Sequence, residues 1–162
     1  MINTMIHADK TGVSFEIRKY LEKDFASLAE MYDLFSPKAK FQGMPPLDGK
    51  TRQKWITKLL KDGENYMALR DIQVIGHAVF LPDLKTRDGE YLIFIRQPFR
   101  GRGIGTELTR TALQEAKVMG LKLIWLSVGA YNFIAIRLYK KFGFNFCEEY
   151  ATESEKKMIL TL

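Results

Sequence analysis

The sequence predicts one α/β domain of the α+β kind, in which a mixed, mostly antiparallel sheet of about seven strands carries helices on both faces. The chain has 162 residues, 46% of them hydrophobic, which suits one sizeable core. Segments with the two-residue period of strands alternate with segments of helical period. Near the middle a strand, a helix and a second strand follow in the order of a parallel crossover, whereas the other strands can pair antiparallel.

The first elements precede a proline-rich loop. Residues 1–12 are expected to form a disordered tail, and residues 13–162 the single domain. Apolar and polar side chains alternate over residues 13–18, which predicts a strand. From Leu21 to Phe35 apolar residues recur every three or four positions, which predicts a helix on the sheet that Ser36–Pro37 ends.

The next stretch is expected to form a helix and a meander of strands. A helix is predicted over residues 48–61, with an aspartate at its cap position. Residues 65–70 and 73–81 are expected to pair as a hairpin. Asp88–Gly89 is expected to make the turn into a strand over residues 91–96.

The C-terminal half contains the crossover and a final hairpin. A helix over residues 104–119 and a strand over residues 123–128 complete the crossover. A second amphipathic helix spans residues 132–142, and residues 144–150 and 156–162 can pair as strands. On that second helix one face carries four apolar residues whose burial we expect: Ile134, Ala135, Leu138 and Phe142.

The loop that opens the first C-terminal helix has the composition of a phosphate cradle. Its glycines allow sharp turns and close approach of a ligand, and the helix that follows presents unpaired N–H groups and the positive end of its dipole. A dinucleotide fingerprint would need glycine where Thr106 stands, and no nucleotide-triphosphate loop is present. The segment reads Arg100, Gly101, Arg102, Gly103, Ile104, Gly105, Thr106.

A second segment, residues 132–144, follows the strand that ends the crossover. Together the two segments resemble the hallmark motifs of the GNAT superfamily of acetyl-CoA-dependent N-acetyltransferases, in the same order and with the same spacing. The resemblance covers about residues 90–146, and the N-terminal half is similar in architecture only. Pro98 lies one position later than the proline that the family often has before the glycine loop.

The resemblance implies a site for acetyl-CoA as co-substrate. Backbone N–H groups of residues 102–106 would hold the diphosphate, with Arg100 and Lys141 as lesser phosphate contacts. Backbone groups of Phe94 and Ile95 would pair with the pantetheine arm, and Asn132 would be a side-chain contact. No metal ligand set is expected.

The resemblance also places a catalytic acid at Tyr139, whose phenol would give a proton to the departing thiolate. The catalytic base is less clear. Ser127 stands where ribosomal-protein N-terminal acetyltransferases have a glutamate, which argues against their mechanism. Glu90 resembles the base of histone-type enzymes and is our candidate, and a solvated carboxylate is the alternative. His77 is a second candidate, although a hydrogen-bonded structural histidine is the simpler interpretation. Water acting on a neutral amine stays open.

The acceptor pocket is expected between the first two helices, where a proline-rich loop spans residues 36–47. Phe41, Met44 and Trp55 could form its wall or could simply cover the core. A small-molecule primary amine, attacked directly in a ternary complex, is our first choice of acceptor. The alternatives are a protein lysine or N-terminus, or a module that senses acyl-CoA without turnover.

The net charge of the chain excludes few classes of binding partner. A net charge of +6 favours polyanions in general, but the basic residues are spread along the chain, so we expect no nucleic-acid partner. No apolar run is long enough for a membrane span, and there is no secretory leader, which predicts a cytoplasmic protein. By analogy with the fold, the final hairpin leaves a homodimer open.

Overall fold

The computed structural model describes residues 3–39, 43–150 and 152–162. Its strands and helices are, in chain order, β1 (Met5–Ala8), β2 (Ser14–Lys19), α1 (Phe25–Leu34), α2 (Gly49–Asp62), β3 (Glu64–Arg70), β4 (Gln73–Asp83), β5 (Asp88–Ile95), α3 (Ile104–Val118), β6 (Leu123–Gly129), α4 (Phe133–Lys141), β7 (Asn145–Cys147) and β8 (Glu155–Thr161). Short 3₁₀ helices stand between them: η1 (Glu22–Asp24), η2 (Gln97–Phe99) and η3 (Glu148–Tyr150).

The strands form one sheet in the order β1-β2-β3-β4-β5-β6-β8-β7. Each neighbouring pair is antiparallel except β5 and β6, which are parallel and are joined through α3. The predicted mixed, mostly antiparallel sheet is therefore confirmed. The described residues hold eight strands where about seven were expected.

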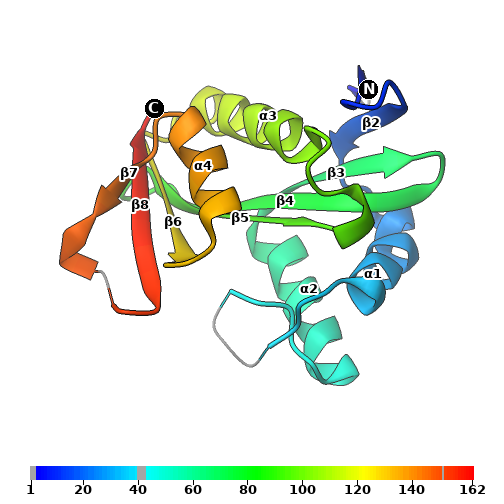
Figure 1. The fold of residues 1–162 in the computed structure, drawn as a ribbon, viewed down its shortest axis with the longest axis horizontal. Helices are drawn as coiled ribbons and strands as arrows, with labels where there is room; N and C mark the ends of the chain where they lie inside the picture. The colour runs from blue at the N-terminus through cyan, green and yellow to red at the C-terminus, as the bar shows by residue number, and fades with distance from the viewer. Residues whose placement is uncertain (1–2, 40–42, 151) are drawn as a thin grey trace.

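Helices cover both faces of this sheet, as the sequence predicted. Figure 1 shows α3 and α4 on one face and α1 and α2 on the other. Under α3 and α4, side chains such as Leu108 and Ile136 pack in one core cluster. Under α1 and α2, Leu28, Ile56 and Phe94 belong to a second cluster. The two clusters hold the helices on opposite sides of the central strands.

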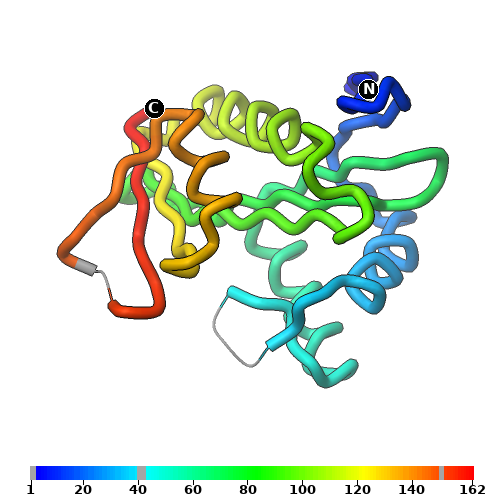
Figure 2. Tube along the Cα trace, viewed as in Figure 1, coloured from blue at the N-terminus to red at the C-terminus, as the bar shows by residue number. Residues whose placement is uncertain are grey.

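The sheet opens between its two parallel strands. Pairing of β5 with β6 is confined to Asp88–Glu90 against Leu123–Trp125. Beyond these residues the two strands diverge, which the chain trace shows clearly (Figure 2). The glycine loop follows the end of β5, and α4 follows the end of β6, so both motifs lie at the open side of this fork.

The expected disordered tail is wrong for residues 5–8, which form β1. Each of these residues pairs with β2, from Met5 opposite Ile17 to Ala8 opposite Ser14. The turn between the strands is held by Asp9, whose Oδ1 accepts from the backbone N–H of Thr11 at 2.8 Å. A local turn and an edge strand are enough to order this segment, although its side chains are mostly exposed.

Two further expectations are corrected. Asp88 and Gly89 belong to β5, and the turn covers residues 84–87, where Arg87 has φ of +60°. Gly89 is needed for close packing, because a Cβ there would lie 3.1 Å from Leu81 O. On α4, Ile134 is 80% exposed, since the helix instead turns Ile136 inward. The other three expected residues of that face do pack against the core.

Candidate active site

The glycine loop turns sharply into the first turn of α3. Gly101 and Gly103 have φ of +75° and +88°, in the left-handed region that favours glycine. Gly103 is the N-cap of α3 and offers no capping side chain. The first intrahelical bond runs from Glu107 N to Gly103 O at 3.3 Å, so the N–H groups of residues 104–106 lack intrahelical acceptors. An anion at this point would meet these donors and the positive end of the helix dipole.

The backbone of β5 directs N–H and C=O groups towards the fork. Arg96 N donates to Ile75 O at 3.0 Å, so this pair is hydrogen-bonded, and the neighbouring residue Ile95 lies in a pair that is not. Because the two kinds of pair alternate, Phe94 directs its N–H and C=O towards β4. Ile93 and Ile95 direct theirs towards β6. Ile93 and Ile95, but not Phe94, therefore direct backbone groups towards the fork, and the contact of this strand with the pantetheine arm stays a prediction.

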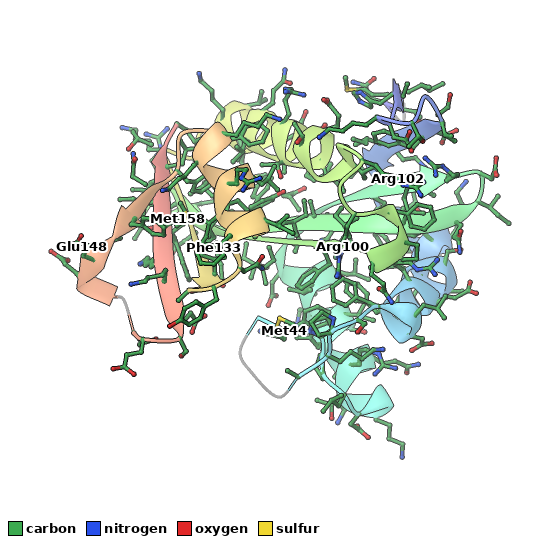
Figure 3. All side chains as sticks on the ribbon, viewed as in Figure 1. Met44, Arg100, Arg102, Phe133, Glu148 and Met158 are labelled. Carbon is green, nitrogen blue, oxygen red and sulfur yellow. The ribbon has the colours of Figure 1, made fainter. Side chains whose placement is uncertain are left out.

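Arg100 does not lie as expected, because its side chain is bonded away from the phosphate cradle. Its Nε donates to Ile95 O at 2.8 Å, and its Nη2 donates to Ser36 O at 2.6 Å. The guanidinium also stacks 5.1 Å from the ring centroid of Phe35, and burial lowers the pKa of Arg100. Arg100 is labelled in Figure 3, above the α1–α2 loop. It ties the glycine loop to that loop, and its role as a phosphate contact stays a prediction.

Helix α4 lies beside the first turn of α3. Leu138 Cδ2 is 3.6 Å from the position that a Cβ on Gly105 would occupy. Asn132 is the N-cap of α4, where its Oδ1 accepts from Ala135 N at 3.2 Å. The amide nitrogen of Asn132 has no partner in the described parts of the chain, so it stays free for a ligand. Lys141 is exposed in the last turn, and its role as a phosphate contact stays a prediction.

Tyr139 is held in the core below α4. Only 7% of it is exposed, and its ring meets Phe144 edge-on at 5.7 Å. Burial raises the pKa of Tyr139, so the phenol keeps its proton at neutral pH. Its hydroxyl makes no hydrogen bond to any residue that the structure describes. Burial is also the main cause that raises the pKa of Tyr91, and Tyr139 adds to it. This places the two phenols near each other at the root of the fork.

Glu90 is the last residue of β5 that pairs with β6, opposite Trp125. Successive side chains of a strand point to opposite faces of the sheet. Tyr91 packs in the core cluster under α3, so Glu90 lies on the opposite face together with Leu92. Burial chiefly raises the pKa of Glu90, Glu155 raises it further, and Lys157 lowers it. The carboxylate is therefore half-buried at the root of the fork, on the side of α1 and α2.

The residues around Glu90 were not predicted from the sequence. Trp125 carries the Lys157 ammonium 4.7 Å from its ring centroid, and Glu155 contributes a second carboxylate. Lys157 lies opposite Ser127 in the β6–β8 ladder, which places both on the face of Glu90. The pairing register of β6 with β8 brings these residues to Glu90, and no local sequence pattern predicts that register.

His77 is a structural residue, which settles one of the two base candidates. Asn65 Nδ2 donates to Leu59 O and Gly63 O, which fixes the orientation of the amide. Asn65 Oδ1 therefore faces His77 Nε2 at 2.8 Å and accepts a hydrogen bond from the Nε2–H group. His77 Nδ1 then accepts from the Tyr32 hydroxyl at 2.5 Å. The ring is fully buried, and burial lowers the pKa of His77 to about 3. Both nitrogens are used, so neither can take a proton from an amine.

The expected acceptor wall is only partly described. Phe41 lies outside the described residues. Trp55 packs at 5.1 Å from Tyr32 and 5.4 Å from Phe94, between ring centroids, and so covers the core beside the fork. Met44 is half-buried in the same loop (Figure 3).

Comparisons with known proteins agree with this geometry. The model of the Acetyltransferase (GNAT) family matches residues 27–144. An L-methionine sulfoximine/L-methionine sulfone acetyltransferase of Pseudomonas aeruginosa is 26% identical over 106 residues, 61% of this chain and 61% of that protein. A spermine/spermidine N(1)-acetyltransferase of Bacillus subtilis is 37% identical over 70 residues, 43% of this chain and 46% of that protein. The chain thus spans 61% and 46% of the lengths of these curated relatives.

Solved structures share the fold. The GNAT domain of S. lividans PAT superposes with a TM-score of 0.82 at 15% identity, covering 98% of this chain and 97% of that chain. A phosphinothricin acetyltransferase of Sinorhizobium meliloti, in complex with AcCoA, gives a TM-score of 0.71 at 18% identity and covers 90% of this chain and 87% of that one. No helix in the described ranges is long and apolar enough to cross a membrane.

Proposed function

The chain belongs to the acetyltransferase (GNAT) family, and we propose that it transfers the acetyl group of acetyl-CoA to the primary amine of a small molecule. The observation that carries this proposal is the fork between β5 and β6, which joins a phosphate cradle at one end to Glu90 and Tyr139 at its root. The family match supports the reaction class, and the two curated relatives described above act, by their names, on L-methionine sulfoximine or sulfone and on spermine or spermidine.

The donor would be held mainly by main-chain groups. The N–H groups of residues 104–106 would take the diphosphate, and the backbone groups of Ile93 with the N–H of Ile95 would pair with the pantetheine arm as an added strand, since Ile95 O already accepts from Arg100 Nε. The free amide nitrogen of Asn132 would donate to the same arm from α4. Most of this recognition is independent of side-chain identity, which is why the glycine loop carries the strongest sequence signal.

The transfer would be direct. The neutral amine nitrogen attacks the thioester carbonyl carbon, the carbon–sulfur bond breaks, and the thiolate takes the phenol proton of Tyr139. The nitrogen gives up a second proton as the amide forms, and this proton restores the Tyr139 phenol. The proton lost by the acceptor ammonium goes, through a water, to the Glu90 carboxylate. Half-burial raises the pKa of Glu90 above its ordinary value, which makes this carboxylate a stronger base.

The acceptor side would favour a cationic amine. Glu90 and Glu155 supply two carboxylates on one face, and Trp125 already holds the ammonium group of Lys157 over its ring. A polyamine can use both kinds of contact. Ser127 lies on this face without a carboxylate, which does not favour the N-terminal acetyltransferase alternative. A sensor without turnover would need neither Tyr139 nor the base.

The experiment is acceptor-dependent thiol release from acetyl-CoA, measured with polyamines, amino acids and lysine peptides. We expect the highest kcat/KM with a polyamine. The Glu90→Gln variant should lose roughly 10²-fold or more in kcat and keep its donor affinity. The Glu155→Gln variant should move the acid limb of the kcat–pH profile to lower pH, because Glu155 raises the pKa of Glu90. An unchanged rate in Glu90→Gln would remove Glu90 as the base, and a peptide as best acceptor would contradict the small-molecule assignment.

A further inference from the structure

Three arginines converge on one aromatic ring beside the glycine loop. The guanidinium carbons of Arg70, Arg96 and Arg102 lie 5.4, 5.6 and 5.7 Å from the ring centroid of Phe99. They come from the end of β3, from the residue that follows β5, and from the glycine loop itself. Figure 3 shows Arg102 near the β3–β4 end of the sheet, away from β6. The group, which we name the arginine cluster, therefore lies beside the glycine loop on the side away from β6.

The arginine cluster carries more positive charge than its surroundings balance. Asp9 is the carboxylate that contacts it within the described ranges, 2.6 Å from Arg70 Nη2 and 4.0 Å from Arg102 Nη1. The same carboxylate also accepts from Thr11, and its side chain is fully buried. One buried carboxylate that is shared in this way leaves most of the positive charge of three guanidinium groups without a counterion.

Arg96 shows the imbalance most clearly. In the part of the chain that the structure describes, its side chain forms no ion pair and no hydrogen bond. Its Nε is buried and has no hydrogen-bond partner. A buried N–H without an acceptor loses its hydrogen bond to water and gains none in the protein, so such a donor is expected to have a ligand. Phe99 fixes the orientation of this group but cannot accept the N–H in place of an oxygen.

A fourth cation stands at the edge of the arginine cluster. Lys10 donates its backbone N–H to Arg102 O at 2.9 Å. Its Cγ and Cε each lie 3.7 Å from the position of a Cβ on Gly103, so its stem crosses the glycine loop. The planar forks of arginine bind oxyanions through two parallel bonds, and several forks together suit an anion with several charged oxygens.

We propose that Arg70, Arg96 and Arg102 form a second oxyanion site, distinct from the diphosphate cradle, that binds a phosphate group. The ligand is inorganic phosphate or the phosphate of a small metabolite, and the N–H of Arg96 Nε donates to one of its oxygens. The site needs no acetyl transfer and stands independently of the proposed function.

The test is a titration of the full chain with inorganic phosphate at constant ionic strength, followed by NMR of the arginine Nε–Hε signals. The signals of Arg96, Arg70 and Arg102 should shift in a saturable way that chloride does not reproduce. The Arg96→Gln variant should weaken phosphate binding about tenfold or more, read on the two remaining arginines. The Arg87→Gln variant is the control, since it removes the same charge at the other end of β5, where Arg87 Nε bonds Gly120 O.

Two further arms identify the source of the phosphate. The titration is repeated with the protein saturated with coenzyme A and then with dephospho-coenzyme A, which lacks the 3′-phosphate. Equal phosphate binding in both complexes supports a separate site. Binding that coenzyme A blocks and dephospho-coenzyme A permits would assign the arginine cluster to the donor's own 3′-phosphate and overturn a separate site. An equal response to chloride, or equal affinity of Arg96→Gln and wild type, would also overturn it.

Discussion

Replacing His77 by glutamine should remove a defined part of the pH dependence of stability. In the fold His77 is neutral, because its Nε2–H donates to Asn65 and its Nδ1 accepts from Tyr32 in a fully buried site. Burial lowers the pKa of His77 from 6.5 to about 3. In the unfolded chain the ring binds a proton below about pH 6.5, whereas the folded ring stays neutral down to about pH 3. This stability is therefore present above the unfolded pKa and is lost as the pH falls from 6.5 to about 3.

The magnitude follows from linkage. Between pH 7 and pH 5 the wild type should lose about 2 kcal/mol of unfolding free energy through this group alone. The pKa values of Asp9 and Asp24 are also lowered, chiefly by hydrogen bonds from Thr11 and from Arg18 respectively, but their ordinary value is 3.8. Their contributions are lost at lower pH. The contribution of Glu90, whose pKa is raised, is common to wild type and variant, so the difference between the two proteins above pH 5 isolates His77.

Urea unfolding of wild type and His77→Gln at both pH values measures the effect. The glutamine amide can accept from Tyr32 and donate to Asn65 without titrating, so the variant should lose far less stability over this interval. Tyr32→Phe is the control, because it breaks the same hydrogen-bond chain but keeps the imidazole, and should be less stable at both pH values with the wild-type slope. An identical slope in wild type and His77→Gln would refute a neutral, buried His77.

Three other predictions concern the donor site, the acid and a helix cap. Gly103→Glu should abolish acetyl-CoA binding in calorimetry by placing bulk and negative charge on the cradle. Gly120→Glu imposes a similar φ strain at the other end of α3 and should bind normally; equal loss in both variants would point to misfolding. Tyr139→Phe should lower kcat roughly 10²-fold at unchanged donor affinity, and a wild-type rate would make Tyr139 structural. Asp48→Ala removes the acceptor of Thr51 N at the start of α2 and should cost about 1 kcal/mol in urea unfolding, with no change expected in donor affinity.

Local chemistry explains why much of the fold could be predicted. Gly101 and Gly103 occupy the left-handed conformations that their positions require, and Asp48 caps α2 as expected. These signals act within a few residues of the chain. The strand alternation of residues 13–18 and the crossover through α3 are similarly local, so the fold class followed from them.

Features that depend on the pairing of distant segments could not be predicted. The alternation of hydrogen bonds along β5 decides that Ile93, rather than Phe94, faces the fork. The sequence gives no sign that His77 is buried or that Tyr32 and Asn65 are its hydrogen-bond partners. The arginine cluster gathers residues from three separate segments, and the bonds of Arg100 to Ile95 and Ser36 depend on where the α1–α2 loop lies. Each of these features depends on a strand register or on the position of a loop, and the spacing of residues in the sequence predicts neither.

Isothermal titration of the protein with acetyl-CoA measures whether the glycine loop and the fork form the donor site. We expect saturable binding of one acetyl-CoA per chain, absent in Gly103→Glu, with thiol release that appears only when an amine acceptor is added. No heat of binding, or binding that Gly103→Glu leaves intact, would contradict the assignment of the glycine loop and the fork as the donor site.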